Sequence, residues 1–164
     1  GGGSPWRLSP HGVRVVVTFY RGEWCPFCNQ ALAGWESKLP ELKAAGATIV
    51  AITPEKPLSA AKTTEKNALT YSVLTDPTQA AAKSFKVHFV MDEATKTKYE
   101  GYGLDLAAAN ASGTWELPAP GTFLIVPDGR GGGTVKYAFA DWDYKKRADP
   151  DVVIAAVKEH GAGK

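Results

Sequence analysis

The chain has few sulfur-containing residues and little net charge. Its 164 residues include two cysteines and one methionine, so a fold held together by several disulfides is excluded. The formal net charge is +2, which gives no strong electrostatic reason to expect nucleic acid as a partner. The densest basic cluster, residues 145–147, is interpreted as solvated surface. No apolar run approaches the roughly 18 residues of a membrane-spanning helix, so we expect no membrane partner either.

The sequence begins at Gly1 and lacks an initiator methionine. We therefore expect residues 1–12 to be a flexible lead or a truncated N-terminal segment. The length and the hydrophobic content of 44% fit one domain with a real core, which we place at residues 13–160. No signal-peptide pattern is visible. The compartment stays open, with a soluble cytoplasmic protein as the expectation.

Both cysteines lie in one short motif, Cys25-Pro26-Phe27-Cys28. The apolar run before it, residues 13–20, is rich in β-branched and aromatic side chains and predicts a buried strand. After the motif, apolar residues recur at intervals of three and four, which predicts a helix over residues 26–45 with Cys28 on its buried face. The residues of this apolar stripe are Cys28, Leu32, Trp35, Leu39 and Leu42.

Cys25 falls just before the first turn of the predicted helix. Pro26 suits the first helical position, because its missing N–H would have no partner there anyway. Unpaired N–H groups and the helix dipole stabilise a thiolate at a helix N-terminus, so its pKa can fall from about 8.5 to roughly 3.5–7.5. We therefore predict that Cys25 is the exposed nucleophile. Cys28, one turn further in, is then the shielded thiol that resolves a mixed disulfide.

Two other interpretations of the motif remain open. Two cysteines are half of a zinc site, but the other ligands would have to come from His11, His88 and His160, which are scattered. The cysteines could also be inert residues of the core or surface. Redox chemistry is favoured over both, and we expect no metal and no cofactor. The histidines are interpreted as structural or solvent-exposed.

The rest of the chain alternates strands and helices. An apolar strand at residues 47–53 follows the first helix, and this order predicts a parallel crossover with catalytic groups at the carboxyl ends of the strands. An irregular segment at residues 86–118 is long for a compact domain, so we interpret it as functional or as a lid over the site. The other expected elements are helices at 58–69, 79–85 and 152–157 and strands at 72–75, 122–126 and 134–140.

Residues 19–29, Phe-Tyr-Arg-Gly-Glu-Trp-Cys-Pro-Phe-Cys-Asn, resemble the active-site stretch of the peroxiredoxin-like AhpC/TSA redoxins of the thioredoxin superfamily. The resemblance extends through residues 117–120 and 141–150 and covers roughly residues 14–158. It implies an α/β thioredoxin fold with a central mixed sheet flanked by helices and an insertion before a strand that follows a cis-proline. Pro120 takes the place of that proline, next to backbone that docks a peptide or thiol substrate.

The resemblance implies a set of site residues around the dithiol. Arg21 is expected to assist a thiolate, to bind an anionic substrate such as glutathione, or to be solvated. Phe19 stands where thioredoxins carry a buried aspartate, so water or another group must accept the proton of Cys28. The predicted catalytic residues are Cys25 and Cys28, and the predicted substrate-binding residues are Trp24, Pro26, Phe27, Arg21, Ala119 and Pro120.

Three functions are compatible with these residues. The first is thiol–disulfide oxidoreduction by the dithiol, with a thioredoxin, a glutaredoxin or a glutathione-like thiol as the electron donor. The second is an antioxidant thiol-dependent peroxidase, with Cys25 peroxidatic and Cys28 resolving. Peroxiredoxins place a hydroxyl and an arginine beside the peroxide in a Pro-x-x-x-Thr/Ser-x-x-Cys pattern, but here Gly22 occupies the hydroxyl position and Pro120 falls near that of the arginine. The third is a non-enzymatic redox-sensing or interaction module.

Overall fold

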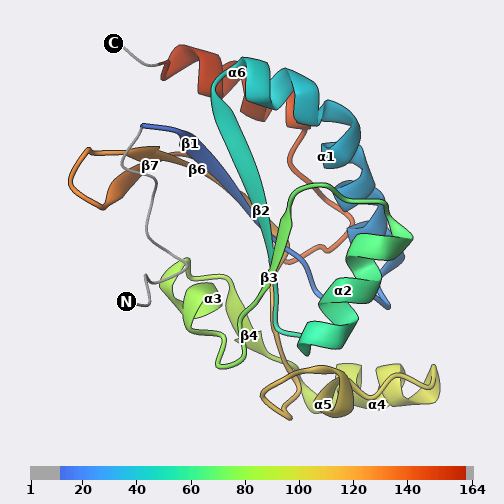
Figure 1. Ribbon diagram of the computed structural model, residues 1–164. Helices are drawn as coiled ribbons and strands as arrows, with labels where there is room; N and C mark the ends of the chain where they lie inside the picture. Colours follow the sequence, from blue (N-terminus) through green and yellow to red (C-terminus); the bar gives the residue numbers. More distant parts are fainter. Residues whose placement is uncertain (1–11, 162–164) are drawn as a thin grey trace.

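A five-stranded mixed sheet forms the centre of the fold in a computed structural model that describes residues 12–161 (Figure 1). The strand order is β3-β2-β1-β6-β7. β1 pairs with β2 and β2 with β3 in parallel, whereas β6 is antiparallel to both β1 and β7. The predicted parallel crossover between the strand before the motif and the strand at residues 47–53 is confirmed. The strands are β1 (Arg14–Phe19), β2 (Ala47–Thr53), β3 (Ser72–Thr75), β6 (Gly121–Pro127) and β7 (Gly133–Ala140).

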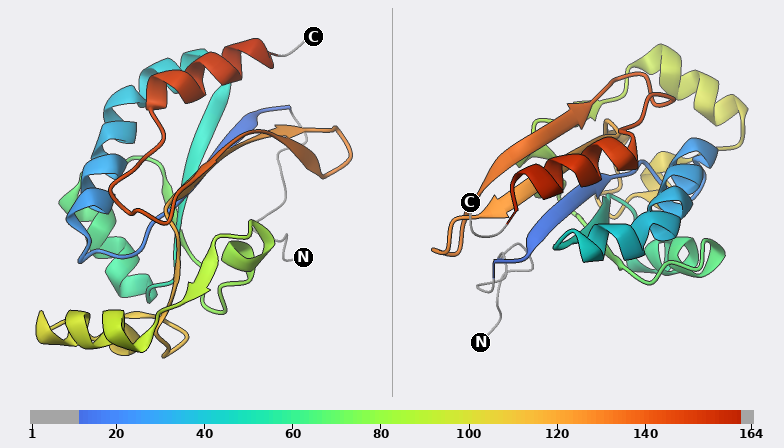
Figure 2. Two further views of the ribbon diagram at one scale, coloured as in Figure 1. Left: turned by 180° about the vertical axis from the view of Figure 1, so that it is seen from behind. Right: turned by 90° about the horizontal axis from the view of Figure 1, so that it is seen from above.

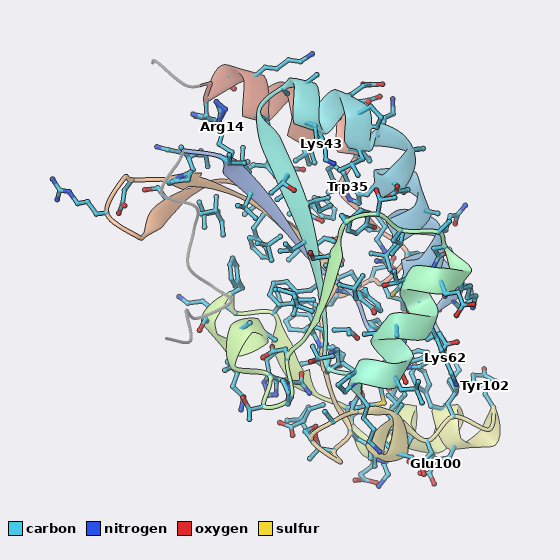
Figure 3. All side chains as sticks on the ribbon, in the orientation of Figure 1. Arg14, Trp35, Lys43, Lys62, Glu100 and Tyr102 are labelled. Atoms are coloured by element: carbon cyan, nitrogen blue, oxygen red, sulfur yellow. The ribbon has the colours of Figure 1, made fainter. Side chains whose placement is uncertain are left out.

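Helices cover both faces of the sheet, as the predicted α/β fold requires. Helices α1 (Pro26–Ala44) and α6 (Pro150–Glu159) pack together on one face, and α2 (Pro57–Lys66) packs beside β3. The short helix α3 (Ala80–Ser84) lies on the other face (Figure 2). The side chain of Arg14 ties the start of β1 to the end of α6, because its Nε donates to the His160 carbonyl at 3.1 Å (Figure 3).

The predicted apolar stripe of α1 is confirmed. Its five members are all buried and belong to the core between α1, α6 and the sheet, together with Val16 and Ile49. A separate core on the opposite face contains Phe19, which packs against Phe85 and Phe123. The alternation of side chains along β1 therefore directs Phe19 away from the two cysteines.

Residues 86–118 are more regular than the sequence suggested. They contain β4 (His88–Val90), α4 (Glu93–Gly101), α5 (Leu106–Ala109) and β5 (Glu116–Pro118), and β4 pairs antiparallel with β5 in a second sheet. The prediction of a mainly irregular segment is wrong, because a small core of Met91, Leu106 and Leu117 holds these elements together. Trp24 packs against this core, so the insertion adjoins the cysteine motif.

The register of the sheet decides what surrounds the motif. Phe19, the last residue of β1, pairs with Ile52 in β2 and with Gly121 in β6. The chain therefore leaves β1 between the carboxyl end of β2 and the start of β6. Within residues 12–161, the structure contains no helix both long and apolar enough to cross a bilayer. The predicted lead at residues 1–12 falls almost wholly outside the described residues, as does His11.

Candidate active site

The first turn of α1 brings the two sulfurs together. Cys25 is the N-cap residue and Pro26 the first residue of the helix, as predicted. The backbone N–H of Cys28 donates to Cys25 Sγ at 3.3 Å. Both residues are buried, however, with 2% of Cys25 and none of Cys28 exposed. The predicted exposure of Cys25 is wrong, because the segment before α6 packs over the motif and brings Arg147 Nη2 to 4.0 Å from Cys25 Sγ.

The negative charge of the pair is stabilised on Cys28. Arg147 Nη2 lies 3.2 Å from Cys28 Sγ, and the Arg21 backbone N–H lies 3.5 Å from it. Burial alone would raise the pKa of Cys28, but the hydrogen bond from the Cys25 thiol and the charge of Arg147 outweigh burial and lower the pKa to about 6. The pKa of Cys25 is raised, first by its hydrogen bond to Cys28 and then by burial. The prediction of a low pKa at Cys25 is therefore wrong, since the partner sulfur outweighs the helix N-terminus.

Arg147 is a site residue that the sequence did not reveal. The basic cluster at 145–147 was interpreted as solvated surface, but Arg147 is partly buried and its Nε donates to the Tyr144 carbonyl at 2.8 Å. The Tyr144 ring packs edge-on against Phe27 of the motif, with ring centroids 5.6 Å apart. The available signal was the resemblance of residues 141–150 to the redoxin family, because that segment contains both residues.

Arg21 is enclosed by aromatic rings rather than solvated. It is 5% exposed, and its guanidinium carbon lies 4.7 Å from the Trp24 ring centroid and 4.4 Å from that of Tyr144. Its Nη2 donates to the hydroxyl of Tyr99, which comes from α4 of the insertion. Neither Arg21 nor Arg147 forms an ion pair with a carboxylate among residues 12–161. Their positive charges therefore act on the dithiol, and the charge of Arg21 opposes the raised pKa of Cys25.

A pocket of about 340 Å³ lies beside the motif, between the sheet and the layer of α1 and α6. Phe27, Pro120 and Arg147 line it, and so does Trp35, which reaches from α1 toward the sheet (Figure 3). Of the predicted substrate-binding residues, Phe27 and Pro120 therefore face this pocket.

The other predicted binding residues lie elsewhere. Pro26 is exposed and does not line the pocket, and Ala119 is buried in the core on the opposite face. Trp24 lines a different pocket. The expected cis bond at Pro120 is wrong, since no peptide bond in residues 12–161 is cis. The chain passes through Ala119 and Pro120 in the trans form that peptides prefer, held by the Ala119 N–H to the Val87 carbonyl at 2.7 Å.

A buried carboxyl group, Glu55, is a second residue that the sequence did not reveal. It is 2% exposed and follows β2, and its Oε1 accepts a hydrogen bond from the Glu23 backbone N–H at 2.8 Å. Burial is the chief cause that raises its pKa to about 7. The signal was its place after strand 47–53, because the carboxyl ends of β1 and β2 meet at the same edge of the sheet.

Within residues 12–161, His88 lies in β4 and His160 follows the last residue of α6. His88 Nε2 contacts Glu116 Oε1 at 2.8 Å between β4 and β5, which fits the predicted structural role. Among residues 12–161, no group of three or more histidine, cysteine, aspartate or glutamate side chains is placed to hold a metal ion.

Comparisons with known proteins show a family and similar structures. The sequence model of the AhpC/TSA family matches residues 3–132. Peroxiredoxin Bcp of Escherichia coli K12 is 28% identical over 149 residues, which span 91% of this chain and 81% of that protein. Peroxiredoxin Q of Xanthomonas campestris superimposes with a TM-score of 0.66 at 22% identity, over 91% of this chain and 80% of the other. A reduced Prx3 of Vibrio vulnificus gives a TM-score of 0.68 at 16% identity, with coverage of 91% and 80%. These two structures support the fold.

Proposed function

Because the chain belongs to the AhpC/TSA family, we propose that it is a thiol-dependent peroxidase in which Cys28 attacks the peroxide and Cys25 resolves the product. The membership bears out the resemblance found in the sequence. It also supports the broader class of thiol oxidoreductases, since the relatives that match over most of the chain are named peroxiredoxins. The choice of peroxide as substrate and the roles of the two sulfurs rest on the geometry of this site.

The observation that carries the proposal is the contact of one guanidinium with both sulfurs. Arg147 Nη2 lies 3.2 Å from Cys28 Sγ and 4.0 Å from Cys25 Sγ. When a thiolate cleaves an O–O bond, negative charge develops on the departing oxygen, and a fixed guanidinium stabilises that charge. Arg147 is thus the arginine that peroxiredoxins place beside the peroxide. The sequence alone offered only Pro120 near that position.

The roles of the cysteines follow from where the anion is held. The Cys28 thiolate attacks one peroxide oxygen, so the O–O bond breaks, Cys28 becomes a sulfenic acid and the other oxygen departs as alkoxide or hydroxide. The Cys25 sulfur then attacks the sulfenic sulfur, forming the disulfide and releasing water. An external thiol system returns the pair to the reduced state. We propose a thioredoxin, glutaredoxin or glutathione-like donor for that step.

This assignment also changes how the peroxiredoxin pattern applies. Counted back from Cys28, the hydroxyl position of Pro-x-x-x-Thr/Ser-x-x-Cys falls on Cys25 rather than on Gly22. The Cys25 thiol hydrogen-bonds to Cys28, so an S–H group stands where the pattern has an O–H group. The S–H group is a weaker donor than a hydroxyl, but it can also act as the resolving thiol.

Burial of the sulfurs argues against the first alternative, a reductase of protein disulfides. Attack on a disulfide needs a thiolate that the substrate sulfur can reach in line, and here 2% of Cys25 and none of Cys28 is exposed. A peroxide is far smaller than a protein disulfide, and Arg147, which contacts both sulfurs, lines the adjacent pocket. The non-enzymatic alternative is disfavoured by the low pKa of Cys28, about 6, because a passive thiol would keep its ordinary value.

The test compares single-turnover reactions of the reduced protein with hydrogen peroxide, with an alkyl hydroperoxide and with a small disulfide. We expect the peroxides to react faster than the disulfide, Cys28→Ser to be inert toward them, and Cys25→Ser to stop at a sulfenic acid that dimedone traps. A sulfenic acid that accumulates in Cys28→Ser instead would reverse the two roles. Faster reaction with the disulfide than with either peroxide would replace the proposed function by the oxidoreductase alternative.

A further inference from the structure

Glu55 is a buried acid that the proposed reaction does not yet use. Its carboxyl group accepts the N–H of Glu23, two residues before Cys25, and it forms no ion pair among residues 12–161. Burying a carboxyl group without a cationic partner costs stability unless the group takes up a proton. A glutamine at position 55 could accept the same hydrogen bond from the Glu23 N–H without carrying a charge. The hydrogen bond therefore does not explain why an acid occupies this position.

The proton balance of peroxide reduction provides one. When a thiol and a thiolate reduce a peroxide to an alcohol and water, they form one disulfide. The reaction needs two protons, and the thiol–thiolate pair holds only one. The Cys25 thiol supplies one of the two protons needed, and the Cys28 thiolate has none to give. One further proton must come from a neighbouring acid or from solvent.

We propose that Glu55 supplies this proton: it is protonated while Cys28 is a thiolate and becomes a carboxylate when Cys25 and Cys28 form the disulfide. The step balances as Cys25 thiol plus Cys28 thiolate plus Glu55 acid plus peroxide, giving the disulfide, the Glu55 carboxylate, one alcohol and one water. The negative charge moves from Cys28 to Glu55, and the net charge of the site does not change. The inference rests on the dithiol–disulfide couple of the proposed function.

The electrostatic link between the two groups runs in the required direction. The charge of Cys28 is one of the causes that raise the pKa of Glu55, and it disappears when the disulfide forms. Loss of the thiolate therefore lowers the affinity of Glu55 for its proton at the point where the reaction needs it.

The surroundings of Glu55 leave a route for the proton. Glu55 lines a pocket of about 440 Å³ on a different side of the motif from the pocket of Arg147. The charged side chains that line the same pocket are Glu23, Lys66 and Asp105, and the charge of Glu23 adds to the raised pKa of Glu55. Protons can thus reach Glu55 again from solvent after the disulfide has been reduced.

The experiment counts protons taken from solvent for each disulfide formed, with a pH indicator in weak buffer, between the pKa values of Cys28 and Glu55. The wild-type protein should take up fewer protons for each disulfide than Glu55→Gln, which must draw the second proton from solvent. Asp105→Asn, which alters a carboxyl group of the same pocket that is not among the causes of the Glu55 pKa shift and which can still cap α5, should behave as wild type. Equal proton uptake by wild type and Glu55→Gln would overturn the proposal.

A second measurement needs no variant of Glu55. The side-chain carboxyl carbon of Glu55 is titrated by NMR in the reduced and disulfide forms, and its midpoint should fall on oxidation, because the charge of Cys28 no longer raises it. In Cys28→Ser, which has no thiolate, the midpoint should already be low. An unchanged midpoint on oxidation would contradict the proposal. Diamide consumes the same protons as a peroxide, so oxidation by diamide keeps this test separate from a failure of the peroxidase activity.

Discussion

Arg147 Nη2 and Cys28 Sγ lie 3.2 Å apart although 119 positions separate the two residues in the chain. The contact joins the segment before α6 to the first turn of α1, and it places the positive charge at the sulfur rather than at the surface. Arg147 Nε also donates a hydrogen bond to the Tyr144 carbonyl, so the segment that covers the motif is the same one that carries the positive charge. The reactivity of the dithiol therefore depends on how the last part of the domain packs.

Replacing Arg147 by methionine should slow the reaction with peroxide by roughly 10²–10³-fold, because the charge that stabilises the departing oxygen is lost. The pKa of Cys28 should rise above its value of about 6 for the same reason. Stopped-flow kinetics and ultraviolet thiolate absorbance against pH measure the two effects. Arg130→Met, in the exposed β6–β7 turn, is the matched control and should change neither. A full reaction rate in Arg147→Met would exclude this role.

The ultraviolet absorbance of the thiolate in the reduced protein should follow a titration with a midpoint near pH 6, the pKa of Cys28. Cys25→Ala should move the midpoint upward, since the hydrogen bond to the thiolate is removed, and Cys25→Ser should move it less, because a hydroxyl can still donate. The thiolate also contributes to the free energy of unfolding. Its pKa is lowered from 9.0 in the unfolded chain, so this contribution is present at alkaline pH and is lost as the pH falls through about 6. If the titration midpoint of Cys28 is the same in Cys25→Ala as in wild type, Cys25 does not donate a hydrogen bond to the thiolate.

Gly22→Ala should destabilise the protein by about 1–3 kcal/mol. A Cβ at position 22 would lie 2.2 Å from Nε1 of Trp24, and this ring cannot move freely because it packs against the Arg21 guanidinium and edge-on against Tyr99. Gly34→Ala is the control, since a Cβ there meets no atom within 4 Å. That substitution should stabilise α1 by about 0.5–1 kcal/mol. Urea denaturation measures both changes in the free energy of unfolding. If the two substitutions change it in the same direction, the close packing of Trp24 over Gly22 is contradicted.

Glu55→Gln should stabilise the reduced protein more at alkaline pH than at acid pH. The pKa of Glu55 is raised from 4.5 to about 7, so the neutral acid favours the folded state below about pH 4.5, and this advantage is lost as the pH rises through 7. Glutamine is neutral at every pH, so the variant does not lose this stability as the pH rises. Denaturation at several pH values gives the difference from wild type. Glu100→Gln, on the exposed surface of α4, should show no such pH dependence (Figure 3).

Local patterns predicted most of the fold. The apolar run before the motif, the stripe from Cys28 to Leu42 and the strand at 47–53 each carry their own periodicity, and all three form as expected. Residues 86–118 were harder to interpret, because their order comes from a small core of Met91, Leu106 and Leu117, which are far apart in the sequence.

The candidate site was predicted in part. The sequence identified the dithiol and its place at the start of a helix, since Cys25 and Cys28 are neighbours in the chain. It assigned the anion to the wrong sulfur, because the helix N-terminus was the one stabilising influence visible locally. Arg147 and Glu55 reach the site from other elements, and their burial could not be inferred from their neighbours in sequence.

By itself, therefore, the sequence determined that this protein carries two thiols one helical turn apart at the end of a buried strand, because helix periodicity and the proline after Cys25 are properties of adjacent residues. The tertiary structure alone decided which thiol holds the negative charge and how far both are shielded from solvent. Those properties depend on the guanidinium of Arg147 and on the segment that carries it over the motif, and the electrostatic effect of such a group depends on distance and burial rather than on position in the chain.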